Sequence, residues 1–170
     1  MNVIKVFFFF FCTLTPFFTY SSNGGISLSQ TRVIFSSNKD SASIYVKNTS
    51  SNDVWLLRGW VTSFESDEKD DSFVITPPLY RLDPERNIQL RINVTDKNKF
   101  PKDVESVYYL NVMAIPPQME KDPSARENTN ISFSINNRIK LFHRPESINN
   151  RKLLAESYKK ITVQQRGGHV

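Results

Sequence analysis

Cysteine and histidine, the side chains that most often carry nucleophilic or metal chemistry, occur three times in this chain, as Cys12, His143 and His169. One cysteine cannot form an internal disulfide or a cysteine-based zinc site, and two histidines do not make a cluster of metal ligands. A hydrolytic triad would have to use His143, which ends a basic segment, or His169, which is next to the C-terminus, and neither is placed beside an orienting aspartate. We therefore expect no enzyme activity, no metal site and no cofactor.

Two charged residues stand inside otherwise apolar segments, where a charge is costly unless it has a partner. Arg32 lies in Thr-Arg-Val-Ile-Phe, and Lys140 lies in Arg-Ile-Lys-Leu-Phe. Such charges can also protect an exposed strand edge from aggregation. For Lys140 the spacing alone favours this second interpretation, because Arg138, Lys140 and Arg144 could line one solvated face.

The elements that carry these charges show the period of two that is typical of β-strands, with turn-forming residues between the segments. The runs with this pattern are 26–35, 42–46, 54–61, 73–76, 88–94, 107–115 and 131–141. About seven strands without a helical period predict an all-β, immunoglobulin-like seven-stranded β-sandwich.

The N-terminal residues 1–21 predict a signal peptide: one lysine, an uncharged phenylalanine-rich run and small residues before a cleavage point. The apolar run is shorter than the roughly 20 residues that a membrane-spanning helix needs, so we expect no membrane insertion after cleavage. Cys12 would be removed with this segment. An exported domain without cysteine fits a bacterial envelope compartment, since small secreted eukaryotic domains usually rely on disulfides.

The composition agrees with one folded domain. Charged residues make up 23% of the chain and hydrophobic residues 39%, which excludes a disordered or a membrane-like chain. Lysine and arginine exceed aspartate and glutamate by 22 to 17. Part of this excess lies in the last 25 residues, which we interpret as a frayed segment and not as a nucleic-acid-binding arm.

Four segments, in order along the chain, resemble the periplasmic chaperones that assemble bacterial pili and fimbriae through the chaperone/usher route. The most specific is 100–117, Phe-Pro-Lys-Asp-Val-Glu-Ser-Val-Tyr-Tyr-Leu-Asn-Val-Met-Ala-Ile-Pro-Pro, which departs from the family pattern at Val104. The other three are 31–35, 74–84 and 137–145. The resemblance implies a periplasmic protein that serves pilin or fimbrial subunits and an outer-membrane usher.

The resemblance also implies roles for particular residues. A pilin lacks the last strand of its sandwich, and the chaperone lends it one, with Ile131, Phe133 and Ile135 filling the subunit's hydrophobic groove. Period two alone would place these three side chains in the chain's own core. Arg32 and Lys140 would bind the C-terminal carboxylate of the subunit and so set the register of the added strand.

Arg91 and Glu105 match family positions that form a charge network between the first domain, here 22–145, and a second domain. Family members continue with a second sandwich, whereas 146–170 resembles only a truncated start of it, which we expect to be poorly ordered. A truncated product, a fragment and a chain whose remainder is encoded separately all stay open. So do two alternative functions, an exported immunoglobulin-like structural subunit or adhesin and an inactive truncated chaperone.

Overall fold

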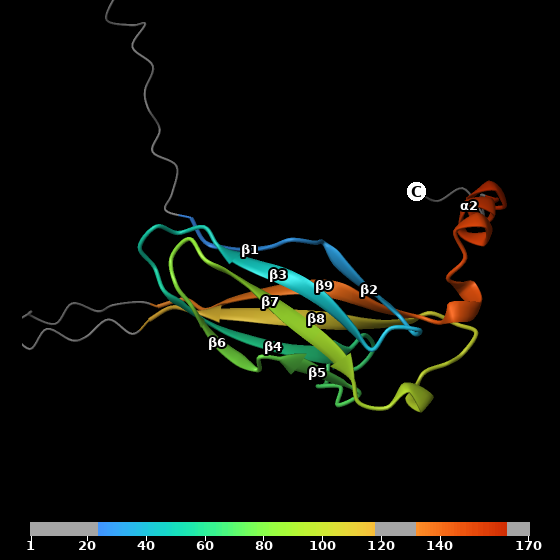
Figure 1. The fold of residues 1–170 in the computed structure, drawn as a ribbon, viewed down its shortest axis with the longest axis horizontal. Coiled ribbons are helices and arrows are strands. Elements are labelled where there is room, and N and C mark those ends of the chain that lie inside the picture. The colour runs from blue at the N-terminus through green and yellow to red at the C-terminus, as the bar shows by residue number, and fades with distance from the viewer. Residues whose placement is uncertain (1–23, 118–131, 163–170) are drawn as a thin grey trace, which may run out of the picture.

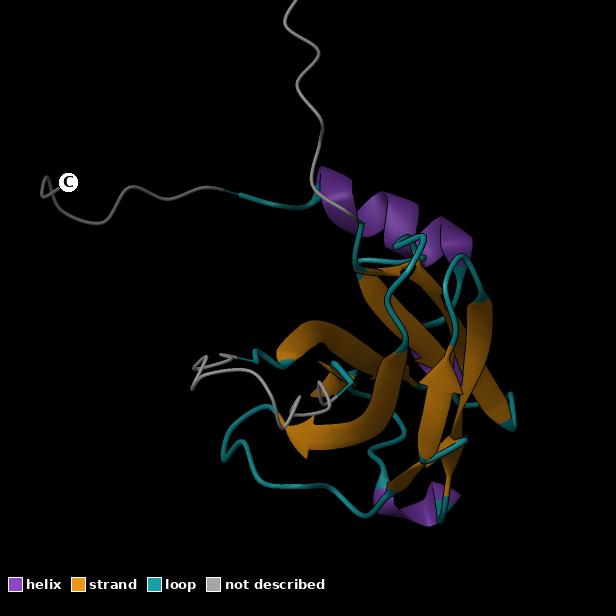
Figure 2. Ribbon diagram, turned by 90° about the vertical axis from the view of Figure 1, so that its left-hand side faces the viewer, coloured by secondary structure: helices purple, strands orange, loops and turns teal. Residues whose placement is uncertain are grey.

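The computed structural model describes residues 24–117 and 132–162, which fold into two β-sheets packed face to face (Figure 1, Figure 2). The predicted signal peptide therefore lies outside the described residues. The four-stranded sheet has the order β1-β3-β7-β5, and the five-stranded sheet has the order β2-β9-β8-β4-β6. The strands are β1 (Ile26–Leu28), β2 (Arg32–Ser36), β3 (Ser41–Asn48), β4 (Trp55–Ser63), β5 (Phe73–Thr76), β6 (Leu79–Leu82), β7 (Asn87–Val94), β8 (Ser106–Ile115) and β9 (Ile135–Arg144).

Alternating apolar side chains from both sheets fill the space between them. In β2, for example, Val33 and Phe35 are buried while Arg32 and Ile34 face outward. The remaining core residues of the strands follow the same alternation: Ile44, Val46, Leu57, Val61, Phe73, Ile75, Leu82, Leu90, Ile92, Leu110, Val112, Ala114 and Leu141. Phe100, which follows the short 3-10 helix Lys97–Lys99, completes the core. The predicted immunoglobulin-like sandwich is confirmed, and burial of these side chains is its main source of stability.

The described part of the chain has nine strands because two features are hidden in the sequence pattern. The run 26–35 divides into β1, which pairs antiparallel with β3, and β2, which pairs in parallel with β9, so the chain changes sheets between them. The second feature is β6, which follows Pro77-Pro78 and has three exposed residues out of four, so it shows no alternation. Both features add short edge strands to the predicted seven.

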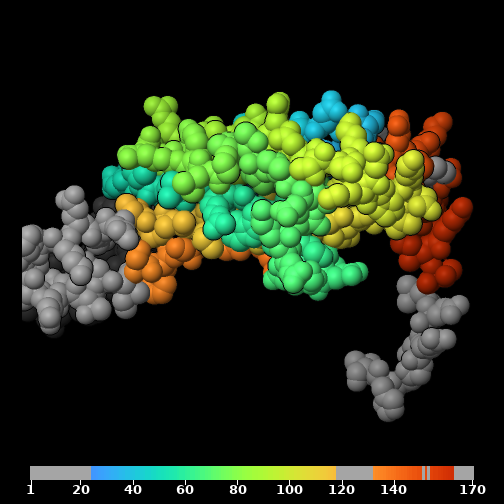
Figure 3. All heavy atoms as spheres, turned by 90° about the horizontal axis from the view of Figure 1, so that it is seen from below, coloured from blue at the N-terminus to red at the C-terminus, as the bar shows by residue number. Residues whose placement is uncertain are grey.

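Strand β9 is longer than β2, one of its two neighbours in the sheet. It pairs antiparallel with β8 over Ile135–His143, whereas β2 covers only Lys140–Arg144. Within the described residues, the backbone edge of 135–139 that faces away from β8 is therefore unpaired. Figure 1 and Figure 3 show that β9 begins at one end of the molecule and that the C-terminal helix α2 lies at the other.

The described residues after the sandwich include two short helices. A 3-10 helix, η2 (Glu146–Ile148), is followed by α2 (Arg151–Lys159), whose first turn is capped by the Asn150 side chain. Ser147 donates a hydrogen bond to the Lys102 carbonyl (2.7 Å), which fastens η2 to the sandwich. None of the helices in the described residues has the length and apolar character needed to span a membrane.

Gly59 of β4 provides a test of the packing between the sheets. A Cβ atom at this position would lie 2.8 Å from Cγ2 of the buried Ile75 on the opposite sheet. We expect Gly59→Ala to lower the free energy of unfolding by about 1–2 kcal/mol, because the added methyl group overpacks the core. Urea unfolding followed by tryptophan fluorescence would measure the change.

Gly25→Ala is the matched control, since a Cβ atom there would meet nothing within 4 Å. Its stability should equal or slightly exceed that of the wild type, because alanine restricts the unfolded chain. Equal stability of the Gly59 and Gly25 variants would contradict the packing described for β4 against β5.

Candidate functional site

Arg32 and Lys140 lie side by side on the outer face of the five-stranded sheet. They are register partners in the parallel pairing of β2 with β9, and both side chains are exposed. Neighbouring strands are about 4.8 Å apart, so two positive charges are held close together. A carboxylate placed between them would relieve the repulsion and accept charge-assisted hydrogen bonds from both.

A shallow depression of about 420 Å³ surrounds the two cations. Its lining includes Thr31, Tyr109 and Phe142 besides Arg32 and Lys140. Tyr109 is the register partner of Lys140 on β8, so the row Arg32, Lys140, Tyr109 crosses three neighbouring strands. The depression therefore offers positive charge in its middle and aromatic surface at its side.

A third cation of this face, Arg138, is already paired. It makes two hydrogen bonds to the Asp67 carboxylate, one of them from Nη1 to Oδ2 at 3.1 Å, and its guanidinium lies 3.8 Å from the centre of the Tyr109 ring. No such ion pair is present for Arg32 or Lys140 within the described residues. The pair Arg32 and Lys140 is thus the part of this basic face that is available to an anion.

Two of the apolar residues predicted to fill the subunit's groove lie just before β9 and at its first position. Phe133 is 74% exposed and Ile135 is 47% exposed, although both share the parity of the buried Leu141 and His143. Ile131 lies outside the described residues. The core-facing row of β9 side chains therefore continues beyond the point where the opposite sheet covers it. The exposure of Phe133 does not agree with the interpretation that this residue fills the domain's own core.

The structure does not pair Glu105 with Arg91. Glu105 accepts a hydrogen bond from Arg144 Nε at 2.9 Å, in a partly buried ion pair at the end of β9. Arg91 lies on the other sheet, where it is exposed on β7 opposite Ser43 and Thr76. Whether Arg91 or Glu105 contacts a second domain stays a prediction.

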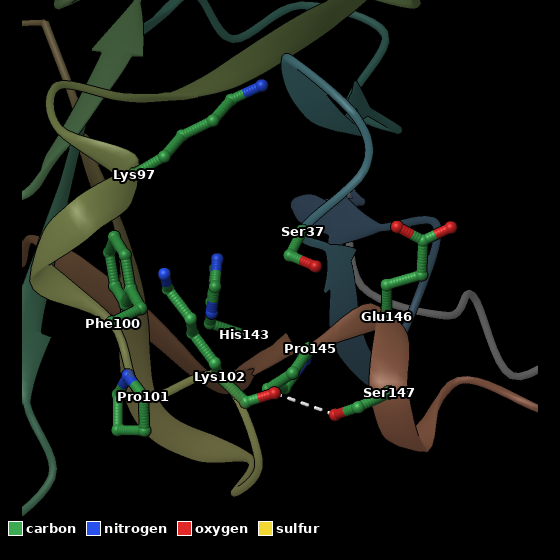
Figure 4. A pocket seen from close by; sticks show the side chains of 9 residues that line it. All are labelled: Ser37, Lys97, Phe100, Pro101, Lys102, His143, Pro145, Glu146 and Ser147. Carbon is green, nitrogen blue, oxygen red and sulfur yellow. Dashed lines mark hydrogen bonds between the residues drawn. The ribbon is translucent and has the colours of Figure 1, made fainter.

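His143 lines a second hollow, at the end of β9, together with Phe100, Lys102 and Pro145 (Figure 4). Its ring is 3% exposed and stacks 3.9 Å from the Phe100 ring. Its Nδ1 has no hydrogen-bond partner within the described residues, and no acidic side chain there orients it as a triad would require. His169 lies outside the described residues. No group of three or more metal-ligating side chains occurs in the described part of the chain.

Three residues of these clusters were not singled out from the sequence: Arg144, Phe64 and Asp67. In the sequence, Arg144 is one of several basic residues near the end of the last strand, because its pairing with Glu105 depends on the register of β9. Phe64 and Asp67 belong to the loop between β4 and β5, whose acidic sequence predicts an exposed turn. Only the fold shows that this loop reaches Tyr109 and Arg138 on other strands.

Comparison with known proteins gives one family match. Residues 25–149 match the model described as pili and flagellar-assembly chaperone, PapD N-terminal domain. A probable fimbrial chaperone, LpfB of Escherichia coli O157:H7, is 44% identical over 126 residues, which is 74% of this chain and 52% of that protein. The chain spans about half the length of the curated relatives that it matches.

Solved structures agree with the family match. The E. coli chaperone DraB is similar with a TM-score of 0.71 and 30% sequence identity, over 85% of this chain and 65% of that one. The SafB chaperone of Salmonella enterica, solved in complex with the SafA pilin, is similar with a TM-score of 0.64 and 28% identity, over 76% of this chain and 59% of that one.

The buried imidazole predicts a pH dependence of stability. Burial lowers the pKa of His143 below its usual 6.5. The unfolded state therefore binds a proton more readily, and stability should fall as the pH drops below about 6.5 toward the lower pKa of the folded state. His143→Phe, which keeps an aromatic ring beside Phe100, should lose less stability between about pH 6.5 and pH 5.

Urea unfolding of both proteins across this range measures the difference. The carboxylates and His169 are common to both proteins, so the difference in slope reports His143 alone. Parallel pH profiles for the two proteins would show that the imidazole gains no proton on unfolding in this range.

Proposed function

We propose, since this chain belongs to the family of pili and flagellar-assembly chaperones, that it binds pilin or fimbrial subunits by lending them the start of β9 as a strand. One observation carries this proposal: the apolar alternation of β9 continues onto Phe133 and Ile135, which are exposed at the end of the molecule. Exposure of large apolar side chains to water is unfavourable in free energy. A partner with a hydrophobic groove would bury them and remove this cost. Ile131, two residues earlier, would extend the same row.

The unpaired edge of β9 supplies the second requirement of strand lending. Residues 135–139 are hydrogen-bonded to β8 on one side only, within the described residues. A strand of the subunit can therefore add to this edge in line with β2, and its main-chain hydrogen bonds would provide affinity.

The cation pair sets the direction of the added strand. Arg32 begins β2 and lies opposite Lys140, at the point where the unpaired edge of β9 ends. A subunit strand parallel to β9 would end here, so that its C-terminal carboxylate meets Arg32 and Lys140. An antiparallel strand would bring its positive N-terminal end to two cations, which is unfavourable. Arg32 and Lys140 would thus form a carboxylate anchor that fixes both the direction and the register of the added strand.

Three further parts of the proposal follow from the family. The protein would act in the periplasm, would deliver its subunit to an outer-membrane usher, and would use binding energy without catalysis. The relation to the SafB chaperone, which was solved in complex with a pilin, supports a pilin as the partner.

Replacement of Arg32 by alanine tests the anchor. We expect about a 10- to 100-fold loss of affinity for a pilin subunit, which is the effect of removing one charge-assisted hydrogen-bonding group. The sandwich should stay folded because the side chain is exposed. The measurement is the yield of a one-to-one complex, by native mass spectrometry, from cells that co-express the chain with a subunit encoded beside it.

Lys47→Ala is the matched control, since Lys47 is an exposed cation on the other sheet. It should leave the yield unchanged. Undiminished recovery of the subunit by the Arg32 variant would count against the anchor.

Replacement of Phe133 by aspartate tests the lent strand. The charge would have to enter the subunit's apolar groove, so we expect loss of the complex in the same co-expression assay. The melting temperature of the free chain should change little, because Phe133 is 74% exposed.

Val74→Asp places the same charge at an exposed apolar position of β5 and should not affect capture. If the Phe133 variant unfolds the free chain, the residue belongs to the chain's own core and the strand-lending role is wrong.

A further inference from the structure

The loop between β4 and β5 is folded back onto the outer face of the five-stranded sheet. Its backbone is closed by hydrogen bonds from Ser63 N to Glu68 O (2.8 Å) and from Asp70 N to Val61 O (3.0 Å). At its tip, the Asp67 carboxylate holds Arg138 of β9 through two hydrogen bonds. This contact joins residues 71 positions apart in the sequence and fixes the loop beside the cation pair.

Phe64, at the start of this loop, forms an aromatic wall with Tyr109. The two ring centres are 5.2 Å apart and the rings are nearly parallel, at 27°. Phe64 has a second neighbour, Lys140, whose ammonium lies 5.7 Å from the centre of the Phe64 ring. Phe64 nevertheless remains 46% exposed, so much of its ring is free to contact a ligand.

This geometry places an apolar surface within one side-chain length of the carboxylate anchor. A carboxylate bound to Lys140 would sit at hydrogen-bond distance, about 2.8 Å, from the ammonium. The free surface of Phe64 is then within reach of a large side chain from the same end of the bound strand. An aromatic side chain there would pack on the ring and withdraw apolar area from water.

We propose that Phe64, held by the pairing of Asp67 with Arg138, is a specificity-determining residue that favours subunits with an aromatic side chain at the C-terminal residue. The inference rests on the proposed function of Arg32 and Lys140 as the carboxylate anchor. Asp67 is a positioning residue in this scheme. It also neutralises Arg138, so the site presents two available cations beside an apolar wall and is matched to a single carboxylate with an apolar neighbour.

Three fluorescein-labelled peptides test this, read by fluorescence anisotropy with the purified full chain. They share one alternating apolar sequence and end in phenylalanine with a free carboxylate, in alanine with a free carboxylate, or in phenylalanine amide. We expect the phenylalanine acid to bind about fivefold more tightly than the alanine acid, the scale of one aromatic contact. Phe64→Ala should reduce this ratio to about one and leave the preference for acid over amide unchanged.

Two further variants separate positioning from folding. Asp67→Asn keeps a residue that tolerates the left-handed backbone found at Asp67 (φ 60°) but removes the charge that holds Arg138, so the ratio should fall between those of the wild type and the Phe64 variant. Asp71→Asn, which affects only an exposed ion pair with Lys69 in the same loop, should keep the wild-type ratio.

The outcomes distinguish the two levels of the proposal. Equal binding of the phenylalanine and alanine acids by the wild type, with the amide weaker, would overturn the role of Phe64 and leave the anchor intact. Equal binding of the acid and the amide, or no binding of any peptide, would overturn the anchor and the inference that rests on it. An unchanged ratio in the Asp67 variant would remove Asp67 from the scheme.

Discussion

The parallel pairing of β2 with β9 is the contact on which the other features of this molecule depend. It requires the chain to leave the four-stranded sheet after Leu28 and to enter the other sheet at Arg32. Because β2 is short, it covers only the second half of β9, and within the described residues the first half has one unpaired edge. The same pairing sets Arg32 opposite Lys140 at the point where the unpaired edge ends. The free edge and the charge pair are thus two results of one register.

The cations on the outer face of the five-stranded sheet differ in whether they have a carboxylate partner. Strands β2 and β9 carry four cations. Within the described residues, Arg138 is paired with Asp67 and Arg144 with Glu105. The other two, Arg32 and Lys140, have no carboxylate partner there. The polar groups farther along this face are satisfied internally: Asn111 donates to Thr62 (3.1 Å), and Asn136 donates to Asn111 (3.1 Å). The contrast with Arg32 and Lys140 supports the proposal that these two side chains bind an anion.

Much of this could be predicted from the sequence, because alternation reports which side of a strand is buried. The sandwich, its core positions and the parity shared by Phe133, Ile135 and Leu141 all followed from period two. Alternation does not report the length over which a strand is covered. The exposure of Phe133 therefore agrees with the family resemblance and could not be predicted from period two alone. Long-range partners were equally hidden: the pairing of Glu105 with Arg144 and the contact of Asp67 with Arg138 depend on register and loop path, which no local pattern encodes. The sheet change between β1 and β2 was missed for the same reason, since apolar alternation continues across it.

The lengths of the edge strands affect how readily the chain can associate with copies of itself. Sheet edges recruit other chains, and the four edges here are formed by strands of three, five, four and four residues, namely β1, β2, β5 and β6. Such short edges offer few backbone groups to a second copy of the chain. In the part of the chain that the structure describes, the stretch open to strand addition is instead the beginning of β9. This stretch ends where Arg32 lies opposite Lys140. A neighbouring copy that brought its own Arg32 and Lys140 to this place would be repelled, so the two cations oppose self-association at this edge.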